Sequence, residues 1–408
     1  MKKHQRYFVI EDDQGQLMPY FVGIRNGGEK YLNTVVDGNE QVILARFDDA
    51  AFFIQKDLQH SLEDFVPDLA TLTFQIELGS ILDKTNRIVN LAESLGARLG
   101  LSKREMQTTE RAAKLCKADL ATNMVVEMTS LQGTMGRYYA MLSGEEPAVA
   151  EAIFEHYLPR FAGDRCPQSK PGLVLSLADR LDSLMGLFAV GLAPTGTKDP
   201  FAQRRAALGL CQNLMEWETH FDLQWGLSEA AHGFDLDISE EDLADCFGFI
   251  KGRLRGILLE LGFRYDVVDA VLAQQAQDPY GAQMDVQALT NWVTREDWHL
   301  ILPAFSRCVR ITRDQAEIFR VDEALFETES ELSLYTALVN AEADLTDLKT
   351  VDGMVKAFLP MVPVINRFFD EVLVMADEDA VRENRLALLQ RISNLSAGIM
   401  DMSCLEGF

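Results

Sequence analysis

The first stretch of the chain alternates short apolar runs with turn residues, and the pattern then changes to a helical period. Residues 6–25 hold two runs rich in Tyr, Phe, Val and Ile around the turn-forming "DDQGQ", and a second turn follows at 26–28. Such runs bounded by turn residues predict a β-hairpin. From residue 37 onward apolar side chains recur every three or four positions, and 38–53 place several of them near one face. This spacing predicts amphipathic helices.

A helical block is expected over residues 78–217. We expect helices to begin at Ser80, Ser102 and Asp199, because these side chains can accept hydrogen bonds from free backbone N–H groups. Residues 221–241 are acidic and interrupted by glycine, so a domain boundary is expected there.

A second helical block starts with the acidic turn after Ser239 and has the spacing of two helices broken at Gly262. A loop is expected at 278–285, and the last hundred or so residues have the pattern of an antiparallel helical bundle. The chain is therefore predicted to be mainly α and multidomain, with a short N-terminal β region. The expected domains are 1–75, 76–220, 221–300 and 301–408.

The charge balance limits which partners the chain can bind. The 408 residues include 63 Asp and Glu against 38 Lys and Arg, which gives a formal charge of −25. So acidic a surface does not bind nucleic acid indiscriminately, because phosphate binding needs positive potential. Any nucleic-acid site must be local, and we expect no DNA partner.

Cysteine usage and hydropathy indicate a compartment. Six cysteines are scattered without a CxxC pair, which is typical of free thiols in a reducing environment. No apolar run approaches the roughly 18 to 20 residues that a spanning helix needs, and the first residues lack the apolar core of a signal peptide. We expect a cytoplasmic protein with no membrane partner.

Candidate chemistry comes first from residues 116–182. Asp119 precedes the Gly-rich turn "LQGTMG", His156 follows in "FEHYLP", and Asp179 lies in "LADRLD". Carboxylates and a histidine from separate helices can hold a metal ion if they converge. The pattern resembles the HD phosphohydrolase superfamily, but Ala118 stands where the histidine of the His-Asp pair is expected. A metal-dependent HD-type phosphohydrolase is the alternative function, and buried, paired carboxylates in a helical scaffold are the favoured interpretation.

The stretch "GLAPTGTKDPFAQRRAALG" at 191–209 joins a turn to the expected start of a helix. Pro200 suits the first helical position and Asp199 suits the cap before it. Three cations lie beside this start, namely Lys198, Arg204 and Arg205. Cations are disfavoured at the positive end of a helix, so they need an anionic partner. Either an internal carboxylate, with Asp179 and Asp182 as candidates, or an external phosphate can supply it.

Basic residues gather in two further places. The interval 98–117 holds more Lys and Arg than Glu and includes Lys103 and Arg104, while Arg307 and Arg310 fall near one helical face. Such faces can contact RNA phosphates, and a solvated helix surface is the competing interpretation.

Several long strings resemble the β subunit of bacterial heterotetrameric glycyl-tRNA synthetase. The strings include "KKHQRYF" (2–8), "LGSILDKTNRI" (78–88), "KADLATNMVVEMTSLQGTMGRYYA" (117–140), "HYLPRFAGD" (156–164) and "LADRLDSLMGLFAVGLAPTGTKDPFAQRRAALG" (177–209). Weaker similarity continues toward the C-terminus, so the resemblance covers essentially the whole chain.

The resemblance implies a subunit that handles glycine tRNA. Residues 1–75 would be the tail of a B3/B4-like region, 76–220 a degenerate HD-like helical domain, 221–300 a helical linker and 301–408 an anticodon-binding bundle. It also implies a synthetase α subunit as partner, carrying ATP and Mg in its class II core. This chain would hold no cofactor, metal or catalytic residue and would act as part of the glycine–tRNA ligase holoenzyme. Because family β subunits are longer at the N-terminus, we expect a C-terminal portion or a shortened form.

The resemblance also suggests which residues contact RNA. Anticodon recognition acts on unpaired bases, where aromatic stacking and arginine hydrogen bonds give selectivity. The candidates in the last domain are Arg307, Arg310, Asn366, Arg367, Phe368 and Arg382. Alternatively, Phe368 is part of the core of the bundle. In the 191–209 stretch we expect Asp199 to cap the helix, one arginine to pair internally, and Lys198 to remain available to RNA.

Overall fold

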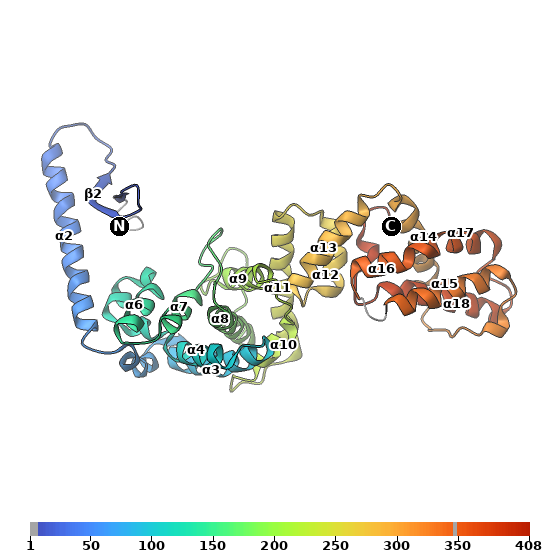
Figure 1. Cartoon of the computed structure of the whole chain (residues 1–408), viewed down its shortest axis with the longest axis horizontal. Helices are drawn as coiled ribbons and strands as arrows, with labels where there is room; N and C mark the ends of the chain where they lie inside the picture. Colours follow the sequence, from blue (N-terminus) through green and yellow to red (C-terminus); the bar gives the residue numbers. More distant parts are fainter. Residues whose placement is uncertain (1–6, 346–348) are drawn as a thin grey trace.

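The computed structural model describes residues 7–345 and 349–408. Residues 1–6 and 346–348 lie outside the described residues. The first of these ranges includes the start of the first expected domain and most of the "KKHQRYF" string. Figure 1 shows the helices following one another in chain order, from a hairpin and one long helix at one end to a helical bundle at the other. The predicted mainly α, multidomain fold is confirmed.

The predicted N-terminal hairpin is confirmed. Strands β1 (Tyr7–Glu11) and β2 (Leu17–Gly23) pair in antiparallel fashion. The Asp12 carboxylate closes the turn, because it accepts hydrogen bonds from the backbone N–H groups of Gln14 and Gln16.

Helix α2 (Leu32–Asp57) follows the hairpin and stands beside it (Figure 1). Its large apolar side chains are mostly exposed: Val36, Val42, Leu44, Phe47 and Phe52. The helix is attached to the next domain at its end. The buried Asp57 carboxylate there accepts hydrogen bonds from the backbone N–H of Asn123 and from the hydroxyl of Tyr139.

The next helices pack around the buried helix α8. A two-residue strand pair, β3 (Thr73–Gln75) and β4 (Gly79–Ser80), leads into them. The helices are α3 (Ile81–Arg98), α4 (Lys103–Leu115), α5 (Asn123–Glu127), α6 (Thr134–Leu142), α7 (Pro147–Glu155), α8 (Lys170–Ala189), α9 (Gln203–Glu216) and α10 (Leu223–Ala231). Ser80 and Ser102 cap α3 and α4 as predicted, since their hydroxyls accept the N–H groups of Asp83 and Glu105.

Helix α9 begins later than the sequence predicts. Asp199 does act as a cap, because its two carboxylate oxygens accept the backbone N–H groups of Gln203 and Arg204 at 2.8 and 2.9 Å. The expected position of Pro200 in the first turn is wrong, since the helix starts only at Gln203. Between them Ala202 has a left-handed backbone with φ of 55°, which ends the preceding turn.

Helices α10 and α11 (Glu240–Glu260) pack directly against the preceding helices α8 and α9. Helix α10 packs against α8, and α11 packs against both α8 and α9. Ser239 caps α11, and the chain turns at Gly262, with φ of 93°, into α12 (Tyr265–Gln275), as predicted. The domain boundaries themselves stay predictions.

The loop expected at 278–285 is wrong. Helix α13 (Pro279–Val293) occupies this stretch, with Asp278 as its cap and Pro279 at its first position. The Asp278 carboxylate accepts the N–H of Gly281 at 3.2 Å. The Asp, Pro and Gly residues there begin a helix rather than form a loop, which is their other common use.

The C-terminal bundle is built around large aromatic side chains, among them Phe305, Phe358 and Phe368, each at most 2% exposed. Its helices are α14 (Trp298–Thr312), α15 (Glu329–Leu345), α16 (Val351–Phe358), α17 (Val362–Glu371) and α18 (Asp379–Ser393). Short 3₁₀ helices complete the connections of the chain: Leu62–Phe65, Pro67–Thr71, Ala118–Ala121, Thr129–Leu131, Glu323–Leu325, Leu359–Met361, Asn394–Ser396 and Met402–Cys404. Among the described residues, none of the helices has the length and apolarity to cross a membrane.

Candidate functional site

Two of the HD-like positions, His156 and Asp179, form a buried charge network with Lys117. Lys117 directly follows α4, and its ammonium lies 2.9 Å from Nε2 of His156 and 2.9 Å from Oδ2 of Asp179. Nδ1 of His156 lies 2.6 Å from the carbonyl oxygen of Ile153. That nitrogen therefore carries the proton, and Nε2 is left to accept a hydrogen bond from Lys117.

The network sets the charge of its members. Burial and the neighbouring Lys117 ammonium lower the pKa of His156 well below its ordinary value, which agrees with a neutral imidazole. For Asp179, burial opposes ionisation, but the ammonium groups of Lys117 and Lys84 together bring its pKa well below the usual range. The Asp179 carboxylate is thus ionised beside a neutral imidazole ring.

A second pair of cations extends the network along α3. Nζ of Lys84 lies 3.1 Å from Oδ1 of Asp179 and 2.7 Å from Oδ2 of Asp182, and Nε of Arg87 lies 2.6 Å from Oδ1 of Asp182. The prediction that Arg204 or Arg205 pairs with these aspartates is therefore wrong. Residues from α3 and from the end of α4 already neutralise them.

Asp119 faces away from this network. Its carboxylate accepts the backbone N–H groups of Gly133 and Gly136 at the start of α6, and burial raises its pKa to about 6. Ala118, at the position of the missing histidine, is fully buried. Within 7–345 and 349–408, no group of three His, Cys, Asp or Glu side chains is placed to hold a metal ion. The residues do not fit a metal, because the ammonium of Lys117 lies between the histidine and the aspartate that would bind it.

The 191–209 stretch presents two exposed cations. Lys198 and Arg205 are exposed. Arg204 is used inside the loop, because it donates to the carbonyl oxygen of Gly196 at 2.6 Å and lies 3.9 Å from a carboxylate oxygen of Asp199. The internal partner of the arginine is thus the capping aspartate.

The other candidates from the helical domain lie on the first turn of α4. Lys103 and Arg104 are exposed, and Arg104 is 3.9 Å from Glu146. Figure 1 shows α4, the connection from α8 to α9, and α14 in different parts of the molecule. The predicted basic residues therefore do not converge on one site.

The C-terminal bundle brings two predicted residues together with a third. The guanidinium of Arg307 on α14 lies 4.3 Å from the ring centre of Phe369 on α17, and it donates to Oδ1 of Asn366 at 3.3 Å. Arg307 is exposed, and Asn366 and Phe369 are half-buried. We call Arg307, Asn366 and Phe369 the α14–α17 cluster.

The remaining candidates of this bundle are engaged with the protein itself. Arg367 pairs with Glu371 at 3.0 Å, Arg382 pairs with Asp379, and Arg310 donates to the carbonyl oxygen of Phe408. Phe368 is fully buried, so it belongs to the core, the alternative that the sequence left open.

Phe369 and the role of Lys117 were not predicted from the sequence. The buried residues Val362, Ile365 and Phe368 recur every three positions along α17, so the helical period alone would have turned Phe369 away from the core. No comparable local signal exists for Lys117, whose partners lie 39 and 62 residues away.

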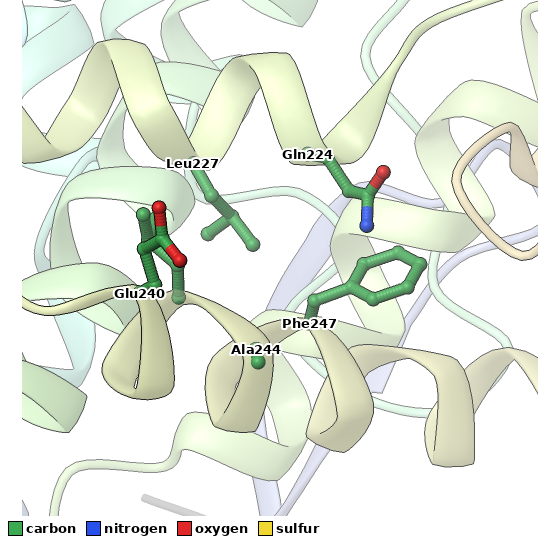
Figure 2. A pocket seen from close by; sticks show the side chains of 6 residues that line it. Gln224, Leu227, Glu240, Ala244 and Phe247 are labelled. Carbon is green, nitrogen blue, oxygen red and sulfur yellow. The ribbon is translucent and has the colours of Figure 1, made fainter.

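A cavity of about 260 Å³ lies between α10 and α11. Figure 2 shows Leu227 and Gln224 directed from one helix toward Ala244 and Phe247 of the other, with Glu240 at the edge. One amide and one carboxylate among apolar side chains do not form a catalytic set.

Two models of known protein families match this chain. A family model described as glycyl-tRNA synthetase beta subunit matches residues 1–273, and one described as DALR anticodon binding domain matches residues 301–402.

Three curated relatives illustrate the similarity. The glycine–tRNA ligase beta subunit of Clostridioides difficile is 40% identical over 408 residues, and that of Desulforudis audaxviator is 42% identical over 413; each alignment covers 99% of this chain and 59% of the relative. The chloroplastic/mitochondrial glycine–tRNA ligase 2 of Arabidopsis thaliana is 37% identical, over 100% of this chain and 38% of that protein. The chain thus spans less than two thirds of the relatives it matches. It belongs to the glycyl-tRNA synthetase beta subunit family.

Proposed function

We propose that this chain is a tRNA-binding portion of a glycine–tRNA ligase, and that its C-terminal bundle binds unpaired anticodon bases of glycine tRNA. The observation that carries the proposal is the α14–α17 cluster, which lies within the residues that match an anticodon-binding domain. Cytoplasm is the proposed location.

The cluster has the chemistry that unpaired bases need. Phe369 supports the planar guanidinium of Arg307 on one side, and a base can stack on a guanidinium or an aromatic face. Oδ1 of Asn366 is held by Arg307, which leaves the amide N–H groups for the edge of a base. Stacking and edge contacts together would select a base that is splayed out of its loop.

The charge distribution supports local binding. The chain carries a formal charge of −25, so RNA is repelled from most of its surface. An exposed cation such as Arg307 is then an attractive point for RNA on a chain of net negative charge. This arrangement favours one orientation of a bound tRNA over others.

The chemistry of the ligase is proposed to take place on another chain. The buried network of Lys117, His156 and Asp179 neutralises itself and does not fit a metal. We therefore assign ATP-dependent activation of glycine, with its Mg, and transfer to the tRNA to a synthetase α subunit that binds this chain. The role of this chain is to position tRNA.

Filter binding of the chain to glycine tRNA and to a transcript with an altered anticodon tests the proposal. We expect tighter binding of the first, and we expect Arg307→Ala to weaken it by about tenfold and to reduce the difference, as for loss of a specific base contact. Arg367→Ala is the matched control on the same face, because Glu371 already pairs with that arginine. Equal affinity of the unmodified chain for both tRNAs would count against anticodon recognition.

A further inference from the structure

A second group of arginines lies in the helical domain, around the ring of Phe154 at the end of α7. The guanidinium carbons of Arg137, Arg160 and Arg165 lie 4.5, 5.1 and 5.4 Å from the centre of that ring. Arg137 comes from α6, and the other two come from the connection between α7 and α8. Three cations from two segments of the chain thus converge on one aromatic ring.

A few carboxylates lie near these cations. Glu151 lies 3.2 Å from Arg137 and 3.6 Å from Arg165, so one carboxylate serves two arginines. The Asp164 carboxylate accepts the backbone N–H groups of Arg160 and Arg165 and holds the loop in its turn. Each of the three arginines thus has a carboxylate nearby, because Asp164 and Asp119 act electrostatically on Arg160.

Arg160 shows that the group has unused hydrogen-bonding capacity. One of its terminal nitrogens donates to the carbonyl oxygen of Gln132 at 3.0 Å. Its Nε is buried without a hydrogen-bond partner in the described part of the chain. Burial also lowers the pKa of this guanidinium, which shows that its charge is poorly solvated. A phosphate beside this guanidinium would offset the poor solvation of its charge.

Exposed aromatic rings flank the arginines. Phe161, next to Arg160, is 63% exposed, and Tyr138, whose ring centre lies 5.4 Å from the guanidinium of Arg137, is 49% exposed. Single-stranded nucleic acid is bound by this combination, in which cations contact the backbone and aromatic faces stack on bases. An acidic protein surface would satisfy the arginines but would give no reason to keep both rings in solvent.

We propose that Arg137, Arg160 and Arg165, with Tyr138 and Phe161, form a second RNA-binding surface for unpaired nucleotides. It rests on the proposed tRNA-binding function and adds a contact outside the C-terminal bundle. In Figure 1, α6 and α7 lie far along the molecule from α14 and α17, so the two surfaces bind different segments of one tRNA. The guanidinium groups contact phosphates, and the two rings accept stacked bases.

The test uses the full chain with transcribed glycine tRNA and the double variant Arg165→Ala/Phe161→Ala, whose side chains are both exposed. We expect affinity to fall about tenfold, and the slope of log affinity against log salt to become less steep by about one unit for each lost phosphate contact. Thermal unfolding should be unchanged. Arg46→Ala/Phe47→Ala on the exposed side of α2 is the matched control and should bind like the unmodified chain.

The outcomes separate this surface from the proposed function. Unchanged affinity of the Arg165/Phe161 variant, while Arg307→Ala weakens binding, would overturn the second surface and leave tRNA binding in place. Equal losses in the α2 control would also overturn it, because the effect would then be non-specific. No binding of glycine tRNA by the unmodified chain would remove the proposed function and this inference together.

Discussion

The ammonium of Lys117 lies 2.9 Å from Nε2 of His156. Two groups that would both be positive at low pH are thus in direct contact in a buried place. The contact is favourable because the imidazole is neutral and accepts the hydrogen bond, and because Asp179 neutralises the lysine on its other side. A side-chain cation, Lys117, thus lies between the histidine and the aspartate of this buried network.

Replacement of Lys117 tests this role. Lys117→Met removes the cation and leaves the Asp179 carboxylate with only Lys84 and the His156 ring without its donor. We expect the free energy of unfolding to fall by about 3 kcal/mol or more, the usual cost of removing one partner from a buried ion pair. Urea denaturation measures this. Lys114→Ala, an exposed lysine one turn earlier on α4, should change stability by less than about 0.5 kcal/mol.

The pH dependence of stability should report the neutral His156. Its folded-state pKa is lowered, so the unfolded chain binds the proton more readily than the folded one. The contribution of His156 is present above pH about 6.5, the value of a free histidine, and is lost as pH falls below it. Relative to His156→Gln, the unmodified chain should lose up to about 1.4 kcal/mol per pH unit below 6.5.

The unmodified chain has to be compared with His156→Gln because Asp119 changes the stability with pH in the opposite direction. Its pKa is raised to about 6, so the folded chain gains relative stability as pH falls from 6 toward 4. Asp119 is present in both chains, and its effect cancels in the difference between them. A difference that does not change between pH 7.5 and 5.5 would mean that His156 takes up a proton as readily in the folded chain as in the unfolded one. Denaturant titrations at several pH values supply the measurement.

Local signals in the sequence were sufficient for much of the fold. Ser80, Ser102 and Ser239 begin helices as predicted, because a cap depends on residues within one turn. The loop predicted after Asp278 was wrong, because Asp, Pro and Gly suit the start of a helix as well as a loop. Burial along α2 could not be predicted, because an apolar stripe does not reveal what packs on it.

The candidate site was less predictable. Its contacts join residues far apart in the chain: Arg307 meets Asn366 across 59 residues, and Lys117 meets Asp179 across 62. Asp179 and Asp182 were considered as internal partners of Arg204 or Arg205, whereas their actual partners are Lys84, Arg87 and Lys117. Packing of α3 and α4 against α8 decides between these cations.

Lys198 and Arg204 should separate RNA binding from stability. Lys198 is exposed, so Lys198→Ala should weaken glycine tRNA binding by a few-fold, as for loss of one phosphate contact, with an unchanged melting temperature. Arg204→Ala removes the bond to Gly196 and the pair with Asp199 and should mainly lower stability. Filter binding and thermal unfolding of both variants make the comparison. Lower stability of Lys198→Ala with unchanged affinity would reverse the assignment.

Asp57 should control the attachment of α2. Its buried carboxylate accepts hydrogen bonds from the segment at Asn123 and from Tyr139, so Asp57→Ala leaves buried donors without partners. A loss of about 2 to 3 kcal/mol at this junction is expected. Hydrogen exchange should rise in α2 and α5 and stay unchanged in α14–α18. Asp49→Ala, on the exposed surface of α2, is the control, and equal exchange in both variants would argue against the anchor.

The adjacent residues Phe368 and Phe369 give the sharpest test of the C-terminal bundle. Phe368 is fully buried, so Phe368→Ala should lower the free energy of unfolding by about 3 to 5 kcal/mol. Phe369 is half-buried and supports Arg307, so Phe369→Ala should reduce affinity for glycine tRNA by about 1 to 3 kcal/mol, the range for lost base stacking, with a much smaller effect on stability.

Urea denaturation and filter binding on the same two preparations separate these effects. Phe368→Leu keeps an apolar side chain in the core and should recover most of the stability without changing affinity. If Phe369→Ala binds tRNA like the unmodified chain, Arg307 does not depend on the ring, and the α14–α17 cluster is a packing contact. A loss of affinity confined to Phe369→Ala and Arg307→Ala would instead place the bound base on the face that α14 and α17 share.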